Sequence, residues 1–61
     1  MNGITAKEWA LSALGSRMVG STWAEVARVN GYASGDEARA AVVAEFGEVW
    51  ATALDRRYPD E

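Results

Sequence analysis

Three times along this chain, a hydroxyl residue is followed three positions later by a glutamate. The pairs are Thr5 and Glu8, Thr22 and Glu25, and Ser34 and Glu37. In a capping box the hydroxyl accepts a hydrogen bond from the backbone N–H three residues on, and the glutamate reaches back to the N–H of the capping residue. The three pairs therefore predict three helix starts. No stretch of the chain alternates apolar and polar residues as a half-buried strand does.

Glycines and a proline indicate where these helices end. Gly20 and the Asn30–Gly31 pair suit left-handed caps, and Pro59 takes Tyr58 out of helical geometry. The predicted helices span about 6–19, 23–30 and 35–57. We therefore expect an all-α fold in which residues 1–61 form a single compact three-helix domain with an extended third helix.

Two glycines inside the predicted helices leave the continuity of those helices open. Gly15 weakens the first helix by roughly 1 kcal/mol relative to alanine, so that helix can end early there. Gly47 carries a similar cost inside the third helix and needs a reason. It either admits a close neighbour or breaks the helix so that the helix bends around the core.

Apolar residues at helical spacing predict the inward faces. They are Ala10, Leu11, Leu14 and Met18; then Val26 and Ala27, with Val29 at their flank; then Ala38, Ala41, Val42, Phe46, Val49, Trp50, Ala53 and Leu54. Large aromatic side chains in so small a chain are expected to pack between helices. That set is Trp9, Trp23, Phe46 and Trp50. The alternative is that Trp23 or Trp50 stays partly exposed and anchors a partner.

The absence of cysteine and histidine narrows the function classes. It excludes disulfides and leaves only carboxylates as side-chain metal ligands, so we expect no metal site and no cofactor. Without these residues or a phosphate-binding glycine loop, we expect no enzyme and no small-molecule substrate. The formal charge of −3 differs from the positive field typical of a duplex-DNA binder. The apolar runs are too short to span a membrane, and the chain does not open with the pattern of a secretory leader. We therefore expect a cytoplasmic protein.

The middle of the chain resembles a known signature. Residues 22–27 are Thr-Trp-Ala-Glu-Val-Ala, and residues 31–34 are Gly-Tyr-Ala-Ser. They resemble the T-W-x-E-[IV]-A-x-x-x-G-Y-x-S pattern of small helix-turn-helix proteins of actinobacteria and their phages, which are similar to resolvase-type and sigma-factor-type DNA-binding domains. The resemblance implies that Ala27 lets two helices approach and that Gly31 makes the turn, with Tyr32 packed beneath it. It also implies that the third helix is the recognition helix, lying in the major groove.

The resemblance further implies which residues face DNA. The groove candidates are Ser34, Asp36, Arg39, Ala40 and Val43, and the phosphate candidates are Arg28 and Lys7. An acid can accept a hydrogen bond from cytosine N4, but beside phosphates it lowers affinity unless basic residues compensate. The predicted function is a small helix-turn-helix regulatory protein that associates with duplex DNA through the start of the third helix, and as a dimer because the chain is acidic.

The alternative function is an acidic protein-interaction module that keeps this fold without binding DNA. Val43, Gly47 and Ala51 recur every four residues along the third helix, where a solvated face should carry charges. Such a strip can seat a second copy or another protein, with Trp50 as a neighbouring anchor, or it can simply face water. The acids after Ser34 have two readings as well, since they serve either as helix caps or as a contact surface for a basic partner.

Overall fold

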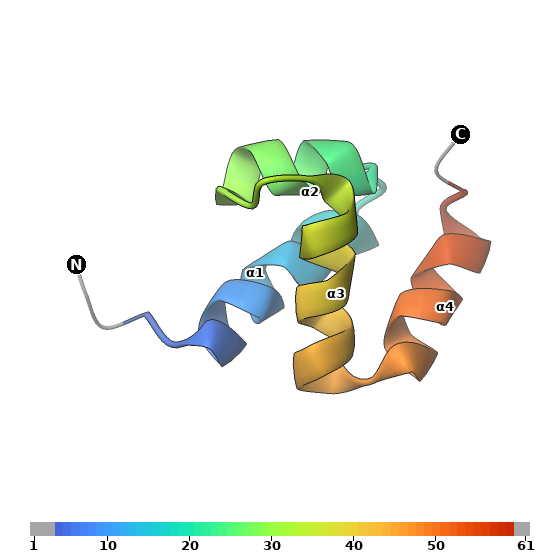
Figure 1. Ribbon diagram of the computed structural model, residues 1–61. Helices are drawn as coiled ribbons and strands as arrows, with labels where there is room; N and C mark the ends of the chain where they lie inside the picture. Colours follow the sequence, from blue (N-terminus) through green and yellow to red (C-terminus); the bar gives the residue numbers. More distant parts are fainter. Residues whose placement is uncertain (1–3, 60–61) are drawn as a thin grey trace.

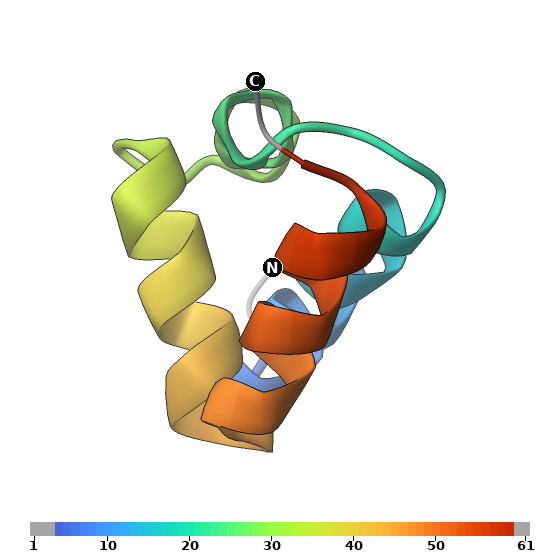
Figure 2. The same cartoon turned by 90° about the vertical axis from the view of Figure 1, so that its right-hand side faces the viewer.

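Every regular element between residues 4 and 59, the part of the chain that the computed structural model describes, is a helix. The helices are α1 (Ala6–Met18), α2 (Trp23–Asn30), α3 (Gly35–Phe46) and α4 (Glu48–Arg57). Figure 1 shows α2 lying across one end of α3, with α4 beside α3 and α1 passing behind it. Figure 2, turned by 90°, shows α4 rising next to both α3 and α1. The all-α prediction is confirmed, with four helices in place of three.

The first three helices begin where the hydroxyl residues predict. The side-chain oxygens of Thr5, Thr22 and Ser34 accept the backbone N–H three residues later at 3.1, 3.1 and 3.2 Å. At Thr5 the glutamate also accepts the N–H of the cap, which completes the box. Each cap supplies a partner for an N–H that the helix itself leaves unpaired.

The prediction of one continuous helix over 35–57 is wrong, because the helix breaks at Gly47. This residue has φ of 107° and ψ of 155°, a conformation that is essentially restricted to glycine. Its N–H still bonds to the carbonyl of Val43, which ends α3, and α4 starts at the next residue. Gly47 is therefore the break that lets the chain fold back along α3. The first helix, in contrast, runs through Gly15 and ends at Met18, one residue before the predicted end.

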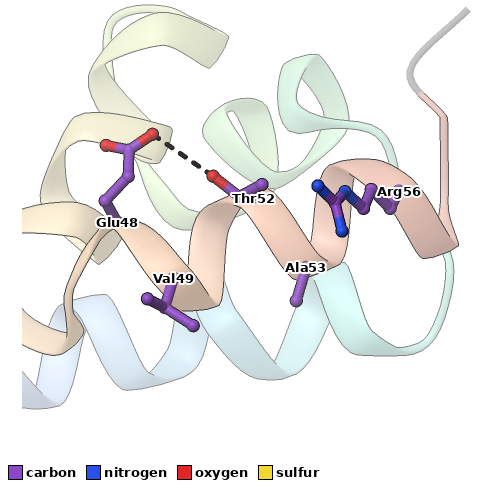
Figure 3. A pocket seen from close by; sticks show the side chains of 5 residues that line it. All are labelled: Glu48, Val49, Thr52, Ala53 and Arg56. Atoms are coloured by element: carbon purple, nitrogen blue, oxygen red, sulfur yellow. Dashed lines mark hydrogen bonds between the residues drawn. The ribbon is translucent and has the colours of Figure 1, made fainter.

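The last helix differs from the others because no side chain caps its start. A shallow open depression on α4 is lined by Glu48, Val49, Thr52, Ala53 and Arg56 (Figure 3). The Thr52 hydroxyl donates to Glu48 Oε2 at 3.3 Å. The opposite side of α4 buries Ala51 and Leu54. As predicted, Tyr58 leaves helical geometry, with φ of −129° and ψ of 79°.

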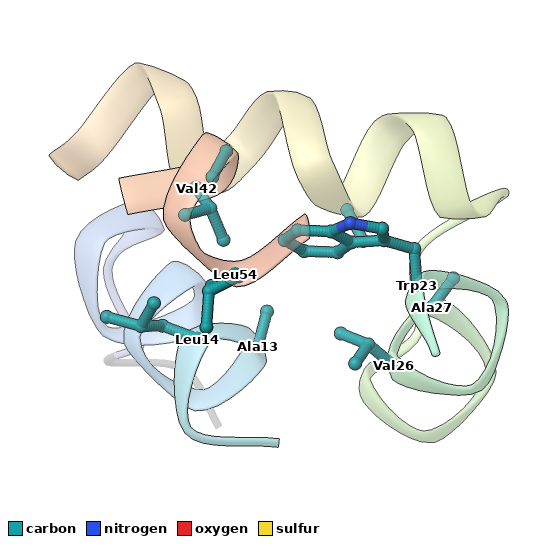
Figure 4. Close-up of a cluster of buried hydrophobic side chains, with 9 residues drawn as sticks. Ala13, Leu14, Trp23, Val26, Ala27, Val42 and Leu54 are labelled. Carbon is teal, nitrogen blue, oxygen red and sulfur yellow. The ribbon is translucent and has the colours of Figure 1, made fainter. Parts of the chain in front are cut away.

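All four helices contribute to the core (Figure 4). Its buried side chains are Ala13, Leu14, Trp23, Val26, Ala27, Ala38, Val42, Ala51 and Leu54. Most of them are alanine or valine, so the helices approach closely and little apolar area is available in each contact. Trp23 is the large exception, and its ring extends from α2 towards Leu54 and Val42. No helix between residues 4 and 59 is long and apolar enough to cross a membrane.

Several predicted core residues lie at the surface instead. Trp9 is 41% exposed and Trp50 is 48% exposed, whereas Trp23 is buried and Phe46 packs against the core while partly exposed. The same correction applies to Leu11, Met18 and Val49. Four short helices enclose only one small core, so apolar residues on the flank of a predicted inward face remain in contact with water.

Candidate nucleic-acid and protein interface

The turn between α2 and α3 brings the first residues of the two helices together. Gly31 ends α2 in the left-handed conformation, with φ of 84°, and Tyr32 N–H bonds to the carbonyl of Ala27 at 2.9 Å. The chain then returns along α2, so that Gly35 lies against the start of that helix. A Cβ on Gly35 would lie 3.1 Å from the backbone nitrogen of Ala24 and 3.2 Å from the backbone of Trp23. Any larger side chain would force the two helix starts apart by a few tenths of an ångström, so glycine suits this approach, which places both N-terminal ends at one edge of the molecule.

Side chains from α1 hold this turn in place. The ring of Trp9 stacks on Tyr32 with centroids 4.4 Å apart, and its indole N–H donates to the carbonyl of Asn30. The Ser12 hydroxyl donates to Asn30 Oδ1 at 2.7 Å, while the Asn30 amide donates to the carbonyl of Val26 at 2.9 Å. Trp9 therefore contacts a neighbouring element, as predicted, but covers the turn from outside.

The tyrosine of the turn is enclosed on its hydroxyl side. The Tyr32 hydroxyl is buried and bonds to none of the described residues. Burial raises the pKa of Tyr32, and the negative charge of Glu45 adds to the increase. Tyr32 thus stays neutral over the physiological range and acts as a packing residue.

The exposed beginning of α3 is small and acidic. Ser34 is occupied with its capping bond, and Asp36, Glu37 and Ala40 are exposed. Val43, the last groove candidate, is partly buried against the core. Of the groove candidates, Asp36 and Ala40 therefore have freely accessible side chains. The Ser34 side chain is also exposed, but its hydroxyl oxygen accepts the capping hydrogen bond.

Arg39, the basic groove candidate, is bound to α4. Its Nε donates to Asp55 Oδ2 at 2.9 Å, and its Nη2 donates to Glu48 Oε2 at 3.2 Å. The hydrogen bond to Asp55 is the main cause of a raised pKa for Arg39, which stays charged throughout. The expectation that Arg39 is offered to DNA is not met in this conformation, because both carboxylates hold the guanidinium on the side of α3 that faces α4.

A second arginine completes a network that the sequence does not reveal. Arg17 is fully buried, and its guanidinium lies 3.6 Å from Asp55 Oδ1 and 5.0 Å from the centre of the Trp23 ring. It donates to the carbonyl of Ser21 at 2.9 Å and to that of Tyr58. A buried charge is tolerated only with such partners. Arg17 therefore fixes the end of α1 to the end of α4.

Asp55 is the centre of this network. It accepts from the Trp23 indole at 2.7 Å and from Arg39, and it faces the charge of Arg17. Burial alone would raise the pKa of Asp55, but the hydrogen bonds from Trp23 and Arg39 and the two positive charges outweigh it. The pKa of Asp55 is consequently lower than its ordinary value of 3.8. These residues lie on four different helices and far apart in the sequence, so no local sequence pattern indicates the network.

The phosphate candidates remain at the surface. Arg28 is exposed on α2, with its Nη2 3.8 Å from Glu25 Oε2, one turn away. Lys7 is exposed in the first turn of α1. An exposed pair such as Arg28 with Glu25 is weak and exchanges readily for another partner. Both bases are therefore accessible to an anion.

The strip of small residues predicted as a protein interface is not a single surface. Ala51 is fully buried, which contradicts its assignment to an interface, while Val43 and Gly47 are partly buried. Because the helix breaks at Gly47, residues on either side of the break no longer share one face. Trp50 is half exposed and is the accessible member of this set.

Comparisons with protein-family models, with curated proteins and with solved structures gave no match for this chain. Among residues 4–59, no three acidic side chains come together as a possible metal site. The two helices joined by the Gly31 turn are the part of the described chain whose geometry and charge bear on function.

Proposed function

We propose that the protein is a small helix-turn-helix regulator that associates with duplex DNA through the start of α3. The observation that carries the proposal is the contact between Gly35 and the start of α2, which brings two helix N-termini to one edge of the molecule. In helix-turn-helix proteins the second helix enters the major groove with its first turns, while the first helix crosses the backbone. The exposed start of α3 has small side chains that leave room for such an approach.

In this arrangement, base contacts come from Asp36 and Ala40, and phosphate contacts from Arg28 and Lys7. A carboxylate accepts from cytosine N4, and an alanine methyl group contacts the methyl group of thymine. Arg39 acts as a positioning residue that fixes α3 against α4. Two phosphate contacts per chain give a weak dependence on salt, with a slope of roughly −2 in log K against log salt concentration.

The test is fluorescence anisotropy with a pool of randomised duplexes at about 50 mM salt, followed by selection of bound sequences. Ala40→Glu places a charge at the centre of the exposed face of α3 and should abolish binding without loss of helix content. Arg28→Gln should weaken binding to all sequences alike. The matched control is Arg57→Gln, which removes one positive charge from the exposed end of α4. Absence of binding by the folded protein at low salt rejects the proposal.

A second candidate function, recognition of a basic protein segment, is favoured by one observation. Arg39 is neutralised within the molecule, so that Asp36 and Glu37 give the exposed start of α3 a negative charge. Asp36→Asn separates the two functions because its effects have opposite signs. It should strengthen binding to DNA by removing repulsion of phosphates, but should weaken binding to an oligolysine peptide used as the probe.

A further inference from the structure

The outer face of α4 is made of residues that suit another copy of itself. The outer face of α4 is the surface formed by Glu48, Val49, Thr52, Ala53 and Arg56, which line a shallow open depression (Figure 3). Val49 is 80% exposed, and the neighbouring Trp50 is 48% exposed. An exposed valine beside a half-exposed tryptophan on one helix is a site where burial against a partner is favourable.

The charges of this face have an order that defines the partner. Glu48, Thr52 and Arg56 follow one another at intervals of four residues, so the acid lies at the start of the row and the base at its end. At a rise of about 1.5 Å per residue, the two charged residues are roughly 12 Å apart along the helix. A two-fold axis through Thr52 that runs two such helices antiparallel brings Glu48 of each copy opposite Arg56 of the other.

We propose that the protein forms a two-fold symmetric dimer through antiparallel packing of the outer faces of α4. Val49 and Ala53 lie along the seam, where the small side chain of Ala53 allows close approach of the helices. The same patch serves both copies, which is the property of an isologous interface. Glu48 is already paired with Arg39 in its own chain, so the second copy adds a partner for Arg56, to which Glu48 offers its free Oε1.

Glu48 is already oriented for this role. Its bonds to Arg39 and Thr52 both use Oε2, and Oε1 bonds to none of the described residues. The two partners hold the carboxylate at the start of the row, so less side-chain entropy is lost when a second copy binds. Ion pairs at the rim of an interface mainly fix its orientation, and apolar burial supplies most of the affinity.

A helix of ten residues offers less area than a standard stable interface, so the dimer is reversible. We expect sedimentation equilibrium without DNA to give the 6.6 kDa monomer near 10 µM and a shift towards twice that mass near about 1 mM. Val49→Lys should abolish the shift. Val29→Lys is the matched control, since Val29 is similarly exposed on α2 and should leave association unchanged.

Charge exchange tests the antiparallel order. Glu48→Arg and Arg56→Glu should each prevent self-association, because each places like charges opposite one another. An equimolar mixture of these two variants should associate as a heterodimer, since both ion pairs are then restored. Arg56→Glu, which breaks no bond of the fold, keeps the test valid if Glu48→Arg unfolds.

A monomer at about 1 mM, or a dimer that survives both Val49→Lys and Arg56→Glu, would overturn the proposal. Association that disappears in both single variants but does not return in the mixture would overturn the antiparallel arrangement. Because no DNA is present, these outcomes are independent of the DNA-binding proposal.

Discussion

The α2–α3 turn and the contact between α1 and α4 are both polar, but they are built from different interactions. At the turn, neutral groups meet: a ring stack between Trp9 and Tyr32, and hydrogen bonds around Asn30. Between α1 and α4, charged groups meet, and Asp55 neutralises a buried arginine. We call the first region the turn lock and the second, formed by Arg17, Asp55 and Tyr58, the clasp.

The difference shows how each part of the molecule acquires its stability. The helices of the turn lock have side-chain caps at their own starts, so local sequence already favours them. α4 has no such cap and is held by residues far away in the chain. A short helix without a cap is unstable alone, so α4 depends on the clasp. Substitutions in the two regions should therefore have unequal effects.

The largest effect is expected for Asp55→Asn. This change leaves the buried Arg17 without its charged partner and should lower the free energy of unfolding by about 3 kcal/mol. Urea titration followed by circular dichroism and tryptophan fluorescence measures the loss. Asp36→Asn, at the exposed start of α3, is the matched control and should cost less than about 1 kcal/mol. Equal losses for both variants would mean that the clasp is no more important than a surface charge.

Acid should weaken the clasp before the turn lock. The pKa of Asp55 is lowered by folding, so its contribution is fully present above its ordinary pKa and is lost as the pH falls through the folded value. The free energy of unfolding should consequently decrease below about pH 4. Urea titrations over this range, compared with Asp55→Asn, isolate the effect from the other carboxylates. If both proteins show the same slope, Asp55 does not titrate as the structure requires.

Gly47→Ala tests the break that allows the clasp to form. Nothing lies within 4 Å of an added Cβ, so the cost is backbone strain at φ of 107°, on the order of 2 kcal/mol. Gly15→Ala is the matched control, because Gly15 also has open space around it but lies inside α1. That change should stabilise the protein by up to about 1 kcal/mol in thermal or urea unfolding. A stabilised Gly47→Ala variant would contradict the break.

Thr22→Ala, on the side of the turn lock, should have the smallest effect. It removes the bond to the Glu25 N–H and should cost about 1 kcal/mol in urea unfolding. Thr52→Ala serves for comparison. Thr52 lies in the middle of α4 and its hydroxyl bonds to the side chain of Glu48 rather than capping a backbone N–H, so the change should stay within about 0.5 kcal/mol. No difference between the two threonines would mean that the cap contributes little.

The sequence predicted the features that depend on neighbouring residues. The caps at Thr5, Thr22 and Ser34 and the left-handed end at Gly31 involve residues at most four or five apart, so their signals are visible in a short window. For Gly47 the sequence allows two interpretations, a close neighbour or a break in the helix, and does not choose between them. A glycine costs the same in either case, and only the packing of α4 against the core decides between them.

The candidate site could be predicted only in part, since tertiary contacts decide which side chains are free. Arg39 belongs to the correct face of the helix, but Asp55 and Glu48 bind it from sixteen and nine residues away. Arg17 shows the same limit, since an arginine in an amphipathic helix is expected in water and is here fully buried. In a helix continuous through Gly47, Ala51 belongs to the outer face, whereas the break turns it into the core.

The hydrogen bonds of Tyr58 couple parts of the chain that lie far apart in sequence. Its hydroxyl donates to the carbonyl of Met18 at 2.7 Å, and its own carbonyl accepts from Arg17, so a residue forty positions away completes the last turn of α1. Fraying of α4 removes both bonds at once. The end of α1 and the whole of α4 therefore open as one cooperative unit. Their amide protons should exchange with solvent at a common rate, distinct from that of α2.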